Sequence, residues 1–153
     1  MKRSLTVLGA MAATLVLAST AVAAGNITVK TIGAFGVGNE VGYPAGHTFR
    51  FEAGPGSAIV TVEVRVPPGG RFPWHYHTTG LTVTVTKGTL TVQDADTCAT
   101  QSFGAGDGFA EEAGGIHQAT NLGSTLTVLY VTYLGIPPGS APDVYEPASY
   151  NPC

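Results

Sequence analysis

Three histidines have the residue type and spacing best suited to chemistry in this chain. His75 and His77 are separated by one residue and stand at the start of the longest alternating pattern of the sequence. Residues i and i+2 of a β-strand project from the same face, so the two imidazoles can point at one place. His117 follows the double glycine at 114–115 and is expected on a separate strand. The three side chains are therefore candidates for one shared site.

Imidazole nitrogens in this arrangement are suited to a divalent transition metal. Three histidines from two strands can hold an ion and leave positions free for water, oxygen or substrate. Ligand type does not choose among Fe, Mn, Ni, Cu and Zn. The alternative for His75 and His77 is an exposed pair at the start of a strand. The fourth histidine, His47, lies in a loop rich in glycine and proline and is expected at the surface or in local hydrogen bonds.

The elements that must position these histidines are β-strands. No segment after residue 23 keeps an apolar period of 3.6 residues, whereas Gly and Pro recur every few residues between clusters of β-branched and aromatic residues. This composition is typical of an all-β fold with many turns. The sequence predicts a single domain that closes into a jelly roll or barrel. The predicted strands span residues 26–32, 48–52, 57–66, 72–86, 89–93, 108–111 and 125–134.

Two of these segments show which face is buried. In the strand predicted over 57–66, the valines at every second position form the apolar face. The segment 72–86 is interpreted as one continuous stretch, and Lys87-Gly88 after it is interpreted as a tight hairpin turn. If no bulge intervenes, an otherwise apolar face of that stretch carries His75, His77, Leu81, Val83 and Val85.

The first 23 residues are typical of a secretory signal peptide. Lys2 and Arg3 precede an apolar run, and Ala21-Val22-Ala23 fits the small-residue cleavage pattern. The alternative is a short membrane anchor, although the run is short of the ~20 apolar residues that a span needs. Residues 24–153 are thus expected to form a secreted or extracytoplasmic domain with no membrane attachment after cleavage.

The charge of the mature chain argues against nucleic acid as a partner. Without Lys2 and Arg3, five basic residues stand against ten acidic ones, and the basic residues are scattered. Binding to nucleic acid depends on clustered Lys and Arg. The partner expected instead is a small-molecule ligand or substrate.

The two cysteines, Cys98 and Cys153, are predicted to form a disulfide because an exported chain meets an oxidising compartment. The alternative is two free thiols, one of them a soft metal ligand. Residues 135–153 contain five prolines, which argue against a helix or a strand inside a sheet. We interpret this segment as an extended strap over the barrel, held by the disulfide.

The spacing of the histidines and glycines resembles the two motifs of the cupin superfamily. The first motif is G-x5-H-x-H-x3-E-x6-G and the second is G-x5-P-x-G-x2-H-x3-N. Eight of the ten defining positions match, and the resemblance covers roughly residues 57–134. It implies a compact β-barrel with a metal inside, and a homodimer through sheet edges is compatible with it. The matching residues are Gly69, His75, His77, Gly88, Gly106, Gly114, His117 and Asn121.

Two positions depart from the motifs. Leu81 stands where the family has a glutamate ligand, and Glu112 stands where it has a proline. Without that glutamate the site has three neutral ligands, as in those cupins with three-histidine sites, which include thiol dioxygenases. Glu112 or its neighbour Glu111 can supply a carboxylate instead, but both are interpreted as solvated loop residues.

Two functions therefore remain open from the sequence. One is a secreted metal-binding cupin that acts as a metal-dependent dioxygenase on a small organic substrate, with His75, His77 and His117 as ligands. The other is a non-catalytic protein that binds a small ligand, a sugar or a metal. Because Leu81 replaces the glutamate, a reaction that uses this glutamate as a base is not expected. The catalytic residues therefore stay unassigned.

Overall fold

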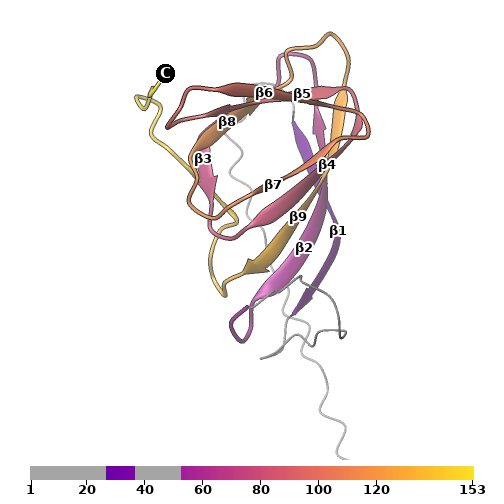
Figure 1. The fold of residues 1–153 in the computed structure, drawn as a ribbon. Coiled ribbons are helices and arrows are strands. Elements are labelled where there is room, and N and C mark those ends of the chain that lie inside the picture. Colours follow the sequence, from indigo (N-terminus) through magenta and orange to yellow (C-terminus); the bar gives the residue numbers. More distant parts are fainter. Residues whose placement is uncertain (1–26, 37–52) are drawn as a thin grey trace, which may run out of the picture.

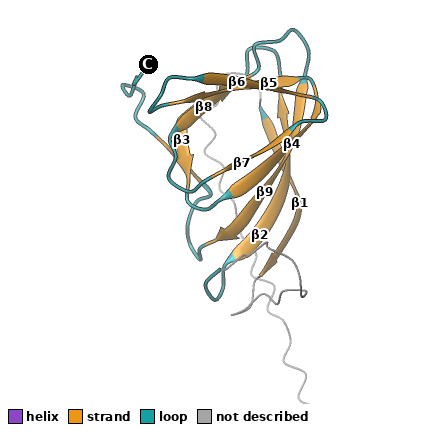
Figure 2. Cartoon of the chain, viewed as in Figure 1, coloured by secondary structure: helices purple, strands orange, loops and turns teal. Residues whose placement is uncertain are grey.

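The computed structural model describes residues 27–36 and 53–153, which form ten strands in two five-stranded antiparallel sheets (Figures 1 and 2). This arrangement confirms the predicted all-β class. The predicted signal peptide, the strand predicted over 48–52 and His47 lie outside the described residues. Among the described residues, no helix is long and apolar enough to cross a membrane.

The first sheet has the strand order β1-β2-β9-β4-β7 and contains the longest strands. All of its neighbouring strands run antiparallel. Its members are β1 (Thr28–Gly36), β2 (Ala58–Val66), β9 (Thr127–Ile136), β4 (Leu81–Lys87) and β7 (Gly108–Glu111).

The second sheet has the order β10-β3-β8-β5-β6 and carries the histidines. It faces the first sheet, so the inward side chains of both sheets share one interior (Figure 1). Its members are β10 (Asp143–Tyr145), β3 (Arg71–His77), β8 (His117–Thr120), β5 (Thr89–Asp94) and β6 (Thr100–Gly104).

The core lies between the sheets and follows the period-2 pattern of the strands. β2 alternates as expected, and its four buried residues are the valines at 60, 62, 64 and 66. On β9, Leu129, Val131 and Tyr133 bury the matching face. Burial of an aliphatic side chain of this size contributes about 1.5–3 kcal/mol, so this apolar face is a main source of stability.

The segment 72–86 is not one stretch, as the sequence suggested, but two strands in different sheets. β3 ends at His77, the chain turns over residues 78–80, and β4 starts at Leu81 in the opposite sheet. β3 also contains a register shift between Phe72 and His75, which leaves Trp74 and His75 both buried. Leu81 therefore faces the histidines across the interior and does not lie beside them on one strand.

The prediction of a hairpin at Lys87-Gly88 is also wrong. β4 and β5 flank Gly88 but belong to different sheets, so the chain changes sheet there. Gly88 has a φ of 72°, a conformation that side chains other than glycine adopt at a cost. A Cβ at this position would lie 2.6 Å from Thr127 Oγ1 and 2.8 Å from the carbonyl oxygen of Leu126. Gly88 thus permits both the turn and the close approach to β9.

The C-terminal segment crosses the end of the interior and returns to β3 (Figure 1). β9 continues to Ile136, so the first two residues of the predicted strap belong to that strand. The rest, residues 137–153, we call the strap; it contains the edge strand β10, which pairs with β3. A disulfide joins Cys153 at its end to Cys98, as predicted.

Candidate metal centre

The three histidines meet at the inner face of the second sheet. β3 and β8 are antiparallel neighbours, and His75 is paired directly with His117. His77 lies two residues along β3, on the same face. The side chains are buried, with exposed fractions of 4–8%. Their ligand nitrogens all lie within 4.8 Å of one another.

Two of the rings are oriented by the backbone carbonyls of residues two positions earlier in the chain. His75 Nδ1 lies 2.7 Å from the carbonyl oxygen of Pro73, and His117 Nδ1 lies 3.0 Å from that of Gly115. A carbonyl oxygen only accepts hydrogen bonds, so each Nδ1 carries the proton and donates. In the neutral rings Nε2 is then unprotonated and available as a metal ligand.

His77 is oriented by the strap instead. Its Nδ1 lies 2.7 Å from Asp143 Oδ1 on β10, and register places Asp143 directly opposite His77. The Tyr133 hydroxyl donates to the same oxygen at 3.0 Å. Tyr145, two residues along β10, stacks on His75 with ring centroids 5.3 Å apart. A carboxylate that accepts from a ligand histidine fixes the ring and raises its basicity as a ligand.

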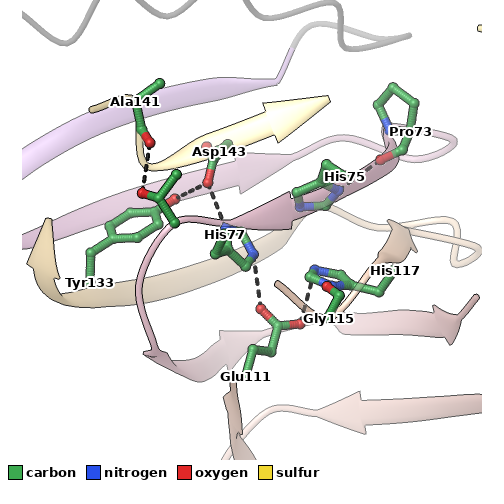
Figure 3. A network of polar contacts seen from close by, with 10 residues as sticks. Pro73, His75, His77, Glu111, Gly115, His117, Tyr133, Ala141 and Asp143 are labelled. Atoms are coloured by element: carbon green, nitrogen blue, oxygen red, sulfur yellow. Dashed lines mark hydrogen bonds and ion pairs between the residues drawn. The ribbon is translucent and has the colours of Figure 1, made fainter. Parts of the chain in front are cut away.

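Glu111 is a site residue, contrary to the prediction that it is solvated. Its side chain is 15% exposed, and its two carboxylate oxygens lie 3.1 Å from His77 Nε2 and 3.2 Å from His117 Nε2 (Figure 3). Glu112, the next residue, is exposed and fits the prediction. Glu111 shares strand parity with Phe109, whose ring packs against the core, but the sequence does not show that this face of the strand meets the histidines.

The charges of the metal-free site centre on His77. Burial alone would lower the pKa of His77, but hydrogen bonds with Asp143 and Glu111 outweigh it and raise the pKa to about 9. Burial and the two neighbouring rings lower the pKa of His75 to about 4. Burial would raise the pKa values of Glu111 and Asp143, but hydrogen bonds with His77 hold both below their usual range. At neutral pH the proton thus resides on His77, between two carboxylates.

A cavity of about 400 Å³ opens from the histidines into the interior. Its polar wall is the histidine cluster with Glu111, Asp143 and Tyr145. A volume of this size accommodates a small organic molecule. The remaining wall is almost wholly apolar and includes Val62, Val64, Leu81, Leu90, Phe109 and Leu129.

Sequence reasoning missed the contributions of the strap. Asp143 and Tyr145 lie in a proline-rich segment whose sequence carries no periodic pattern, and only the pairing of β10 with β3 shows their place. The motif residue Asn121 has a structural part: its amide nitrogen donates to the carbonyl oxygens of Val66 and Thr125, and its oxygen accepts from Gly123. It therefore fixes a turn and makes none of the site's polar contacts.

The fold has two facing β-sheets, and its buried histidines converge on an interior cavity. These features are typical of the class of β-barrel proteins that bind a metal in the barrel interior. Residues 62–133 match the family model described as "Cupin domain". This match places residues 62–133 in the cupin superfamily, and the prediction from the two motifs is confirmed. The fold is accordingly the predicted cupin fold.

Solved structures show the same fold. A cupin-like protein from Thermotoga maritima is 18% identical, with a TM-score of 0.54 over 81% of this chain and 78% of its own. The polyketide cyclase RemF from Streptomyces resistomycificus is 20% identical, with a TM-score of 0.50 over 59% of this chain and 63% of its own. At these identities the likeness concerns the fold alone. A search of curated protein sequences found no match.

Proposed function

We propose that this protein is a secreted metal-binding cupin that holds a divalent transition metal at His75, His77 and His117 and acts on a small organic substrate. Fe, Mn, Ni, Cu and Zn all suit such ligands. The observation that carries the proposal is the convergence of three buried ligand nitrogens within 4.8 Å of one another. Their Nδ1 atoms are all engaged by outer partners, which leaves Nε2 for the ion.

The bound metal would polarise a substrate oxygen or activate dioxygen. The protein's own residues contribute position and exclusion of water. Asp143 and two carbonyl oxygens hold the rings in place, and Tyr145 stacks on His75. The apolar wall of the cavity receives the body of the substrate and keeps bulk water from the reacting end.

The cavity favours a substrate with an apolar body and one polar end. Most polar side chains of the lining, those of the histidines, Glu111, Asp143 and Tyr145, form one wall, so the polar end would lie there. In a dioxygenase reaction both atoms of O2 enter the substrate, which also supplies the electrons, so no separate reductant is required.

A second candidate is a non-catalytic protein that binds a small ligand, a sugar or a metal. One observation favours it: both carboxylates of the site are already bonded to histidines, so neither is free to act as a general base. The apolar lining favours an apolar ligand over a sugar.

Metal analysis tests the shared part of the two candidates. Protein purified from its export route should contain about one transition-metal ion per chain, and the double variant His75→Ala/His77→Ala should contain none while the barrel still folds. Tyr76→Ala, on the same strand between the two histidines, is the matched control. Equal metal in the double variant would place the site elsewhere. An N-terminus at residue 24 in the exported protein supports secretion, and a chain that retains Met1 contradicts it.

Activity separates the candidates. Oxygen uptake by the Fe(II)-loaded protein with thiols, flavonoids or diketones, absent in the double variant, would support the dioxygenase. Tight ligand binding without oxygen uptake across several metals would support the non-catalytic candidate.

A further inference from the structure

The carboxylate that the first cupin motif lacks at Leu81 has a counterpart on the neighbouring strand. β4 and β7 are antiparallel, and Leu81 is paired directly with Glu111. Directly opposed residues of an antiparallel pair point to the same face, with Cβ atoms about 4.5–5.5 Å apart. Leu81 is 2% exposed and lines the cavity, and Glu111 lines it too. A carboxylate at 111 thus enters the interior next to where one at 81 would.

The contacts of Glu111 have the spacing of ligands that share an ion. Metal–nitrogen and metal–oxygen bonds are about 2.0–2.2 Å long, so two ligands at 90–109° around one ion lie about 2.8–3.6 Å apart. The Glu111 oxygens lie 3.1 Å from His77 Nε2 and 3.2 Å from His117 Nε2 (Figure 3). These separations match neighbouring positions of one coordination sphere.

The hydrogen bonding around His117 is compatible with a metal ion at Nε2. Its Nδ1 donates to the carbonyl oxygen of Gly115, so in the neutral ring Nε2 presents a lone pair to a Glu111 oxygen. Two acceptors at this distance repel unless a proton or a metal ion lies between them.

We infer that Glu111 is a fourth metal ligand, which replaces across the β4–β7 pair the glutamate that Leu81 lacks. The inference rests on the proposed metal binding and goes beyond the three-histidine site. Three neutral imidazoles and one carboxylate give a divalent ion a net charge of +1 instead of +2. The metal would also tie β7 of the first sheet to β3 and β8 of the second.

An exchange of the two residues tests the inference without changing the composition of the chain. The mature wild type is compared with Glu111→Leu, with Glu111→Gln and with the exchanged variant Leu81→Glu/Glu111→Leu. Glu112→Gln removes the same charge one residue away at an exposed position and is the matched control. Affinity for Co²⁺ and Zn²⁺ is measured by competition with a chromophoric chelator, and the visible spectrum of the Co²⁺ form reports the ligand set.

We expect Glu111→Leu to weaken metal binding by more than about 100-fold, because loss of an outer partner of a ligand already costs about 10–100-fold. Its Co²⁺ spectrum should change, Glu111→Gln should weaken binding in the same direction, and Glu112→Gln should match the wild type. The exchanged variant should regain affinity to within about 10-fold of the wild type, together with the wild-type spectrum.

Failure of this inference differs from failure of the proposed function. If the wild type binds metal but Glu111→Leu and Glu111→Gln keep its affinity and its Co²⁺ spectrum, Glu111 is no ligand and the three-histidine site stands. If Glu111→Leu does not fold, unchanged binding by Glu111→Gln together with an unchanged spectrum overturns the inference. If the wild type binds neither metal, the proposed metal binding fails and the inference with it.

Discussion

Replacement of Asp143 by asparagine separates two opposing effects of the strap on metal binding. The carboxylate lies 2.7 Å from His77 Nδ1 and 3.0 Å from the Tyr133 hydroxyl. Asparagine has the same shape, and its amide oxygen can still accept both hydrogen bonds, so the change removes the charge and little else. It therefore weakens the outer support of His77 as a ligand and also lowers the pKa of His77.

These two effects act in opposite directions on the measured affinity. Loss of an outer carboxylate weakens metal binding by about 10–100-fold, or about 1.4–2.8 kcal/mol. In the wild type the pKa of His77 is about 9, so at pH 7 a metal must displace a proton at a cost of about 100-fold. Asp143→Asn reduces that competition. The variant should consequently resemble the wild type at pH 7 and show its full defect only near pH 9.5.

The assay is competition with a chelator that buffers the free metal from pH 6.5 to 9.5. Wild-type affinity should rise about tenfold per pH unit up to pH 9 through His77, and the ratio of wild-type to variant affinity should grow over the same range. Asp96→Asn, which removes an exposed carboxylate, is the control. A wild-type affinity that stays flat between pH 7 and 9, or a ratio that does not depend on pH, would refute the assignment of the proton to His77.

Three further predictions concern stability. Cys98→Ser/Cys153→Ser should lower the free energy of unfolding by about 4 kcal/mol, the loop-entropy value for a separation of 55 residues, as measured by urea unfolding. The free energy of unfolding of the metal-free protein should fall by about 3 kcal/mol between pH 6.5 and 9.5. The reason is that the raised pKa of His77 stabilises the fold fully below pH 6.5, and this stabilisation is lost as the pH rises through 9. The lowered pKa of His75 has the opposite effect, so stability should also fall from pH 6.5 towards 4. Gly88→Ala should lower the free energy of unfolding by about 3 kcal/mol or more, measured as a fall in the urea midpoint. The causes are the left-handed backbone at residue 88 and the close contact of the new Cβ with the start of β9.

Each of these has an outcome that contradicts it. Equal urea midpoints for the serine variant and the wild type would mean that the disulfide adds nothing to stability. A stability that stays constant from pH 6.5 to 9.5 without metal would show that His77 has an ordinary pKa in the fold. Gly106→Ala is the control for Gly88→Ala, since its φ is also positive but nothing lies near its Cβ; an equal loss in both variants would exclude the contact as a cause.

Some features of the protein were accessible from the sequence because they depend on local rules. The alternation on β2 predicted its buried valines, since successive side chains of a strand point to opposite faces. The spacing of His75 and His77, with His117 after a double glycine, marked the histidine cluster before any fold was known. The prediction of export led from the two cysteines to their disulfide, which the structure contains.

The wrong predictions arose where the sequence pattern continues past a point at which the chain leaves one sheet and pairs with strands of the other. His75 and His77 have the same strand parity as Leu81, Val83 and Val85, yet the turn at residues 78–80 transfers the chain to the opposite sheet. Likewise, Lys87-Gly88 has the residues of a hairpin but joins two sheets. Residue type decides that a turn forms, whereas pairing with distant strands decides which sheet the chain joins next.

The sequence by itself determined the fold class and the three histidines, because period, turn chemistry and motif spacing are properties of short segments. Only the tertiary structure decided the rest of the site. Glu111 faces the histidines because β7 pairs with β4, and Asp143 reaches His77 because the strap returns to β3. Both contacts join residues far apart in the chain, so the carboxylates that set the charge of the site become apparent only when the strands are paired.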